Sequence, residues 1–171
     1  MDDRAVVALQ LGRAPRAFRR VVARCPFGFP AVTEQDPYDR HGKPLPTTYY
    51  LTCRHLVAAI ARVEAAGGVE RWSKLAADDA DLARSLARAT EEQRRLRHKL
   101  AEARQASDGG ASLDLGIAGS RSERHLKCLH AHAAFALARP GYELGERILA
   151  EVEPLWPPIR CCSEELRGAQ E

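Results

Sequence analysis

The spacing of hydrophobic residues divides the chain into a strand-rich first third and a helical remainder. After an amphipathic segment at 1–12, β-branched and aromatic residues gather at 17–24, 31–35 and 47–52, and proline and glycine separate the first two of these runs. These three runs are expected to form a small antiparallel sheet within residues 17–52.

The rest of the chain has apolar residues at helical spacing, broken by glycine and proline. We expect helices at 53–66, 69–76, 78–106, 122–138 and 143–153. The longest of them, around 78–106, contains a heptad seam in which apolar positions alternate four and three apart with one polar member. The seam consists of Leu82, Leu86, Ala89, Gln93, Leu96 and Leu100.

This pattern predicts an α+β fold, a mostly helical single domain with a small N-terminal antiparallel sheet. The domain is expected to cover residues 1–158, with residues 159–171 as a C-terminal tail, because Pro154, Pro157 and Pro158 end regular structure. A chain of 171 residues with 45% hydrophobic content is long enough to bury one core.

Charge and cysteine content narrow the class of protein. The net charge of +3 is below that of a dedicated nucleic-acid binder. No apolar run approaches the roughly 18–20 residues that span a bilayer, and the charged N-terminus does not have the order of a signal peptide. We therefore expect a cytoplasmic protein whose five cysteines are reduced.

The segment 127–132 contains the clearest candidate chemistry. On a helix, Cys128 and His132 project from one face about one turn apart, a spacing that suits two ligands of one metal ion. His130 points about 160° away from Cys128 on the same helix. His130 is thus a weaker partner for Cys128 than His132, although it remains a candidate ligand.

Two further cysteines stand in distinctive settings. Cys25 precedes a proline, and Cys53 lies where a predicted strand gives way to a helix, whose N-terminus is expected to lower the pKa of its thiol. Together with Cys128 and a histidine they would form a soft, zinc-type site. Cys161 or Cys162 could replace one ligand.

Two other interpretations stay open. Free cysteines are often small buried hydrophobes, and the histidines would then be hydrogen-bonded core or surface residues. Alternatively, Cys128 or Cys53 is a catalytic nucleophile with a histidine as its base. Neither the proximity nor the oxyanion donor that thiol catalysis needs can be read from the sequence.

The long helix offers two candidate surfaces. A basic cluster at Arg94, Arg95, Arg97, His98 and Lys99 could contact phosphates, but nearby glutamates favour a solvated helix face instead. The seam at 82–100 could bind a protein partner or a second copy of the chain. Packing within the domain is the more usual fate of such a helix.

Several motifs, taken together, resemble the bacterial family of unknown function called DUF501. They lie at residues 24–32 (RCPFGFPAV), 46–53 (PTTYYLTC), 62–67 (RVEAAG), 116–119 (GIAG) and 127–132 (KCLHAH). The chain departs from the family at Arg54, where proline is common, and at 142–145, where the family often has Asn-Pro-x-Gly.

The resemblance implies a cytoplasmic bacterial protein without an established activity. Genes of this family sometimes lie near one for a septum-formation protein, which is only an association. The resemblance also implies that Cys25, Cys53, Cys128 and His130 occupy characteristic motif positions, which favours a shared site.

The leading hypothesis from the sequence is a non-enzymatic module that binds zinc through Cys25, Cys53, Cys128 and His132 or His130. The alternative is a metal- or cysteine-dependent hydrolase of a small substrate, such as a phosphorylated one. A third is a nucleic-acid or cell-division adaptor that uses the basic helix. A fourth protein ligand would favour the structural role, and an open metal position the hydrolase.

Overall fold

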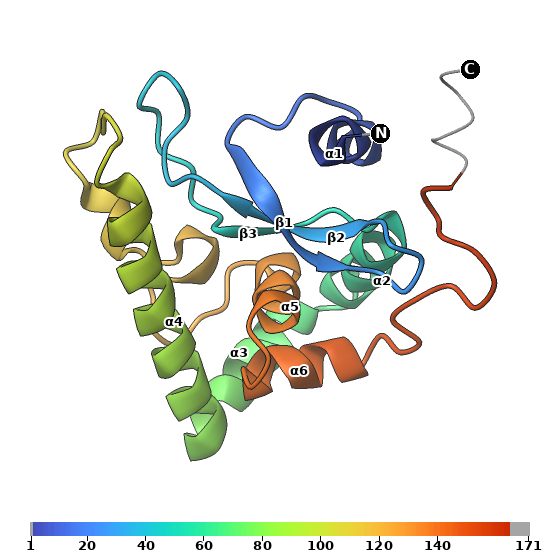
Figure 1. Ribbon diagram of the computed structural model, residues 1–171. Coiled ribbons are helices and arrows are strands. Elements are labelled where there is room, and N and C mark those ends of the chain that lie inside the picture. The colour runs from blue at the N-terminus through green and yellow to red at the C-terminus, as the bar shows by residue number, and fades with distance from the viewer. Residues whose placement is uncertain (1, 165–171) are drawn as a thin grey trace.

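The computed structural model describes residues 2–164, in which a three-stranded sheet lies between helices (Figure 1). The strands are β1 (Phe18–Arg24), β2 (Pro30–Gln35) and β3 (Tyr49–Leu51), antiparallel in the order β1-β2-β3. The α-helices are α1 (Asp3–Leu11), α2 (Arg54–Ala65), α3 (Gly68–Asp78), α4 (Ala80–Ala101), α5 (Leu129–Ala138) and α6 (Glu143–Ala150). Two short 3₁₀ helices are η1 (Ala111–Asp114) and η2 (Ile117–Gly119). The predicted α+β class is confirmed.

The central strand β2 is buried on both faces, which explains the small and apolar residues at its start, 30–33. Val32 pairs with Ala23 on one side and with Leu51 on the other. Glu34 is also buried, and its carboxylate accepts two hydrogen bonds from Arg20, its partner across β1. The charge on this strand is therefore compensated within the sheet.

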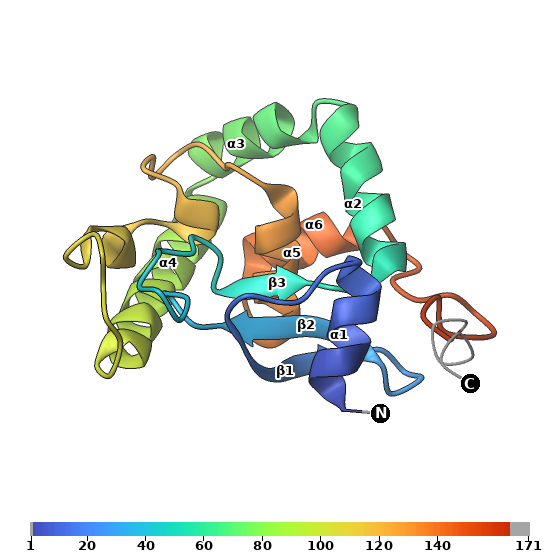
Figure 2. The ribbon, with the colours of Figure 1, turned by 90° about the horizontal axis from the view of Figure 1, so that it is seen from above.

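Helices cover the two faces of the sheet unequally. Helix α1 lies over β1 and β2 on one face, as the view from above shows (Figure 2). Helix α5 packs against the other face, chiefly on β3, and α6 lies beyond it (Figure 1). Because α5 is covered by the sheet on one side and by α2 and α6 on others, it is apolar almost all round.

Helices α5 and α6 approach so closely that one position has no room for a side chain. A Cβ atom added to Gly145 would lie 2.7 Å from the carbonyl oxygen of His132, 2.8 Å from Ala136 Cβ and 2.6 Å from the ring of Tyr142. Two of these neighbours are a backbone atom and a helix methyl group, which cannot rotate away. The contact therefore requires glycine.

Gly145→Ala is expected to destabilise the fold by about 1–3 kcal/mol, because overpacking outweighs the better helix propensity of alanine. Urea denaturation of the two proteins measures the difference in free energy of unfolding. A variant as stable as the parent would show that propensity dominates and that the two helices are free to separate.

The helix predicted at 122–138 begins later than the sequence indicates. The Ser122 hydroxyl accepts the backbone N–H groups of Arg124 and His125, at 3.2 and 3.0 Å, so the chain turns without forming a helix. The N–H of Leu126 donates to Ser73 Oγ at 2.9 Å. Helix α5 consequently starts at Leu129, with Cys128 as its extended N-cap residue.

Helix α4 turns its predicted seam toward the core. Leu82, Leu86, Ala89 and Gln93 are all buried, and the helix packs on α3 and α6. Arg97, one turn beyond Gln93, is only 1% exposed, although the sequence places it in a basic surface cluster. Its position follows from the same helical period that buries the seam.

The segment after α6 has little regular structure, yet part of it is firmly packed. Cys161 and Ser163 are buried, and the Ser163 hydroxyl accepts a hydrogen bond of 3.0 Å from Gln10 of α1. The described part of the expected tail thus lies against the domain. Among residues 2–164, no helix is both long and apolar enough to cross a bilayer.

Candidate metal centre

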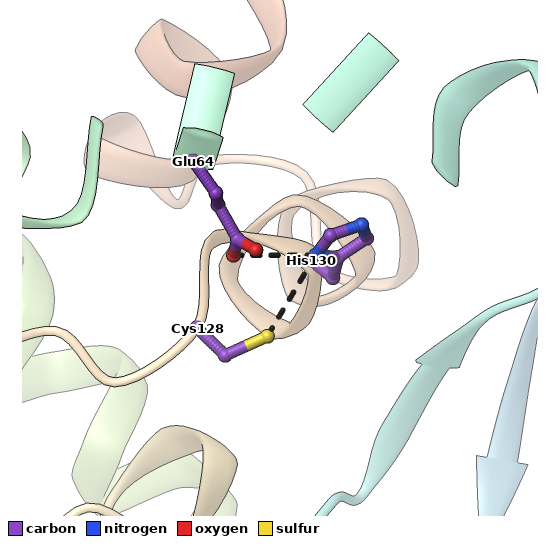
Figure 3. Close-up of side chains that lie close together, drawn as sticks. All are labelled: Glu64, Cys128 and His130. Carbon is purple, nitrogen blue, oxygen red and sulfur yellow. Dashed lines mark hydrogen bonds and ion pairs between the residues drawn. The ribbon is translucent and has the colours of Figure 1, made fainter. Parts of the chain in front are cut away.

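Three potential metal ligands meet where the last turn of α2 contacts the first turn of α5 (Figure 3). Glu64 comes from α2, Cys128 is the N-cap residue of α5, and His130 lies in its first turn. One donor atom from each of the three lies within 4.8 Å of the other two. All three residues are half-buried, so the cluster is reachable from solvent.

Glu64 is held in place by the helix opposite it. Its Oε1 atom accepts the backbone N–H of Leu129 at 2.6 Å. A carboxylate at this position satisfies one of the free N–H groups of α5 and interacts favourably with the positive end of the helix dipole. Glu64 therefore has a structural role as well as a place in the cluster.

The hydrogen bonding of His130 determines which ring nitrogen can bind a metal. Its Nε2 atom lies 3.1 Å from the carbonyl oxygen of Val57, and a carbonyl can only accept, so Nε2 carries a proton. The other nitrogen, Nδ1, lies 3.2 Å from Glu64 Oε1 and 3.9 Å from Cys128 Sγ. In a neutral ring, the free lone pair of Nδ1 thus faces the thiol and the carboxylate.

A second proton on His130 would satisfy the two acceptors when no ion is bound. The pKa of His130 is raised to about 9, chiefly by the hydrogen bond with Cys128 and also by the negative charge of Glu64, while burial opposes the rise. The same three donors are ordinary zinc ligands. A cation can therefore take the place of the shared proton.

The cluster opens onto a cavity of about 280 Å³, which Cys128 and His130 help to line. The rest of the wall comes from β3 and its flanks and from α2 and α5. Those residues are Thr47, Tyr49, Tyr50, Leu51, Val57 and Ala131. A second cavity, of about 440 Å³, shares Thr47 and Tyr50 and includes Arg13 and Arg16.

The geometry is poor for a cysteine–histidine catalytic relay. In such a relay, one imidazole nitrogen activates the thiol and the other is oriented by an acid. Here Cys128 and Glu64 both face Nδ1, and Nε2 is bonded to the Val57 carbonyl. Donors that converge on one point suit ligation better than relayed proton transfer.

The other predicted ligands lie elsewhere. Cys25 Sγ is 3.7 Å from Cys161 Sγ, and Cys53 Sγ is 3.9 Å from Cys162 Sγ. Within residues 2–164, the Glu64 cluster is the only group of three or more such donors at mutual ligand distance, so Cys25 and Cys53 do not join Cys128.

His132 does not share a face with Cys128, because Cys128 precedes α5 and is extended. The expected pairing of residues four apart is therefore wrong. His132 is buried in the core, where its Nδ1 lies 2.7 Å from the Tyr142 hydroxyl. Burial lowers the pKa of His132 to about 3, so the ring is neutral.

The expected acidity of Cys53 is also wrong. Burial raises the pKa of its thiol to about 12. The backbone N–H groups of Leu56 and His55, at the start of α2, act in the opposite direction but are outweighed. Desolvation of a thiolate thus exceeds the effect of the helix N-terminus here.

Sequence reasoning missed Glu64, although it lies within the RVEAAG motif at 62–67. Glutamate is common on helix surfaces, and no local spacing links α2 to α5. Only the packing of these two helices brings Glu64 to Cys128. The motif resemblance was the one signal that could have marked it.

Most of the basic cluster on α4 has partners within the chain. Arg94 donates to the carbonyl of Asp114, His98 contacts the Asp114 carboxylate, and Arg95 lies 3.5 Å from Glu91. Arg97 is buried. Because of these contacts, fewer basic side chains of the cluster can bind phosphate groups than the sequence alone suggests.

A family model described as "Protein of unknown function (DUF501)" matches residues 21–150, a span that contains all three members of the cluster. No curated protein and no solved structure matches the chain. The comparisons therefore support the family resemblance seen in the motifs. They assign no activity, so the function is inferred from the geometry of the site.

Proposed function

The chain belongs to the DUF501 family, and we propose that it is a metal-binding protein that holds a zinc-type ion with Glu64, Cys128 and His130. The observation that carries this proposal is the convergence of three different donors on one point, where Nδ1 of His130 faces both the carboxylate and the thiol. The thiolate and imidazole favour zinc over magnesium or calcium, which prefer oxygen ligands.

The surroundings of His130 support the same proposal. Histidines that bind metals usually donate their other N–H to a carbonyl or carboxylate, which fixes the ring and its tautomer. The bond from Nε2 to Val57 has this form. An ion at this place would join α2 to α5, the helix at the centre of the core.

The proposal predicts one bound ion at this site per chain. Protein purified without a tag or chelator is expected to lose one equivalent of zinc when Glu64 is changed to Gln or Cys128 to Ser. Elemental analysis measures the content, and Glu70→Gln, an exposed glutamate of α3, is the matched control for Glu64→Gln. Equal zinc content in the parent and both site variants would refute the site.

A second candidate function is a metal-dependent hydrolase, which the cavity favours. Among the described residues, three protein ligands are within reach, and catalytic zinc sites typically keep a fourth position for water or substrate. Arg13 and Arg16 line the second cavity, which shares Thr47 and Tyr50 with the first, and they would suit an anionic substrate such as a phosphate ester.

Hydrolysis of aryl phosphate and carboxylate esters, assayed with zinc-loaded and metal-free protein, separates the two functions. Turnover that requires zinc and disappears in Cys128→Ser would establish the hydrolase. Full zinc binding without turnover of any ester in the panel favours the non-enzymatic module.

A further inference from the structure

Four of the five cysteines gather at one place, although they come from three distant parts of the chain. Cys25 lies in the turn after β1, Cys53 is the N-cap residue of α2, and Cys161 and Cys162 belong to the segment after α6. The sulfurs form two contacts, Cys25 with Cys161 at 3.7 Å and Cys53 with Cys162 at 3.9 Å. Because Cys161 and Cys162 are adjacent, these two pairs are linked directly.

Both distances match one edge of a tetrathiolate metal site. Zinc–sulfur bonds of about 2.3 Å in a tetrahedron place neighbouring sulfurs about 3.8 Å apart. A disulfide, by contrast, requires about 2.05 Å, so each pair would have to close by more than 1 Å. The four sulfurs are not all at mutual ligand distance, since no three of them meet that condition. An ion would therefore draw the two pairs together.

A backbone N–H group faces one of these sulfurs. The N–H of Ser163 donates to Cys161 Sγ at 3.4 Å. The same hydrogen bond would stabilise negative charge on the sulfur of a metal-bound thiolate.

The segment after α6 is one that a bound ion could fix against the rest of the domain. The segment from Glu151 to Glu164 has no helix or strand, yet Cys161 and Ser163 are buried against the domain. Trp156 packs against both the main core and the small apolar cluster that contains Cys25 and Cys161. A structural metal ion would add folding energy to such a segment.

We propose that Cys25, Cys53, Cys161 and Cys162 bind a second soft, zinc-type ion, which pins the C-terminal segment to the β1–β2 turn and to α2. This site shares no residue with the Glu64 cluster, and the two proposals are independent of each other. With four protein ligands it has no open position, so its role is structural.

The test uses the full chain, purified under reducing conditions without chelator. Zinc content is measured in the parent, in Cys161→Ser, in Cys162→Ser and in His130→Ala. Each of the two cysteine variants is expected to lose one equivalent, and His130→Ala to keep that equivalent. After replacement by Co²⁺, the absorption bands typical of tetrahedral thiolate coordination should persist in His130→Ala and disappear in Cys161→Ser.

Thiol counting on the parent protein tests the proposal without any variant. With a chromogenic disulfide reagent, these four thiols, and Cys128 as a ligand of the other proposed site, should react slowly before chelation and quickly after it, with release of zinc. Four thiols that react equally with and without chelator would overturn the proposal.

Discussion

His130→Ala is expected to weaken zinc binding at the Glu64 site by at least about a hundredfold. Loss of a residue that merely orients a ligand costs 10–100-fold in affinity, and His130 is itself a proposed ligand. Its removal leaves one thiolate and one carboxylate, and that carboxylate already accepts the N–H of Leu129. Two donors from this site cannot complete a zinc shell.

Competition with a chromophoric chelator measures this affinity at fixed pH and salt. His125→Ala is the matched control, because His125 lies near the same helix, is exposed and is not a member of the cluster. The control is expected to bind zinc as the parent does. If His130→Ala bound zinc as tightly as the control, the proposed role of His130 would be wrong.

The second large effect concerns Arg97, the largest fully buried side chain in the described part of the protein. Burial lowers its pKa, and the nearby groups Tyr38 and Asp108 raise it. Its hydrogen bonds are long, 3.4 Å to Thr48 Oγ1 and 3.4 Å to the Ser112 carbonyl. The buried positive charge thus depends on a negative charge nearby.

Asp108 contributes negative charge near Arg97 and is itself well bonded. Its carboxylate accepts hydrogen bonds from the Tyr38 hydroxyl at 2.7 Å and from the N–H groups of Gly110 and Ser112 at 3.0 and 2.9 Å. Burial raises the pKa of Asp108, but these hydrogen bonds outweigh it, so the pKa is well below the usual range. The ionised form is the stable one in the fold.

Asp108→Asn is therefore expected to destabilise the protein by about 1–3 kcal/mol, since it removes the charged acceptor of three hydrogen bonds and a negative charge that favours the Arg97 cation. Thermal and urea unfolding measure the difference. Asp114→Asn is the control, because Asp114 is exposed and its contact with His98 should contribute less than about 1 kcal/mol. Equal losses of unfolding free energy in the two variants would contradict the proposed role of Asp108.

The lowered pKa of Asp108 also predicts that the stability of the protein depends on pH. Because the folded-state pKa of Asp108 is lowered, its contribution is present above the ordinary aspartate pKa and is lost as the pH falls toward the folded value. The stability difference between the parent and Asp108→Asn should shrink as the pH falls below about 4. A difference that stays constant down to pH 2 would contradict the assignment.

Local sequence signals predicted the secondary structure well. Strand propensity at 17–24 and 31–35, and the proline and glycine between them, mark β1, the turn and β2. The seam of α4 was visible as a heptad pattern, and the burial of its first four members follows from that pattern, whereas Leu96 and Leu100 are only partly buried. The start of α5 was missed because the Ser122 side chain satisfies N–H groups that a helix would otherwise use.

The site could be predicted only in part, because ligands from distant segments meet through packing. Cys128 and His130 were both candidates, but their contact depends on where α5 begins. Glu64 reaches them across a helix–helix contact that no sequence spacing encodes. For Cys25 and Cys53 the sequence indicated a soft site, and the structure puts Cys161 and Cys162 beside them.

The central claim is that Glu64, Cys128 and His130 bind one ion, and anomalous X-ray diffraction at the zinc edge tests it most directly. Crystals of the zinc-loaded protein are expected to show an anomalous peak between Glu64 Oε1, Cys128 Sγ and His130 Nδ1, with zinc–ligand distances of about 2.0–2.3 Å. The same crystals would contradict the account if they had no peak there and showed His130 paired directly with Glu64.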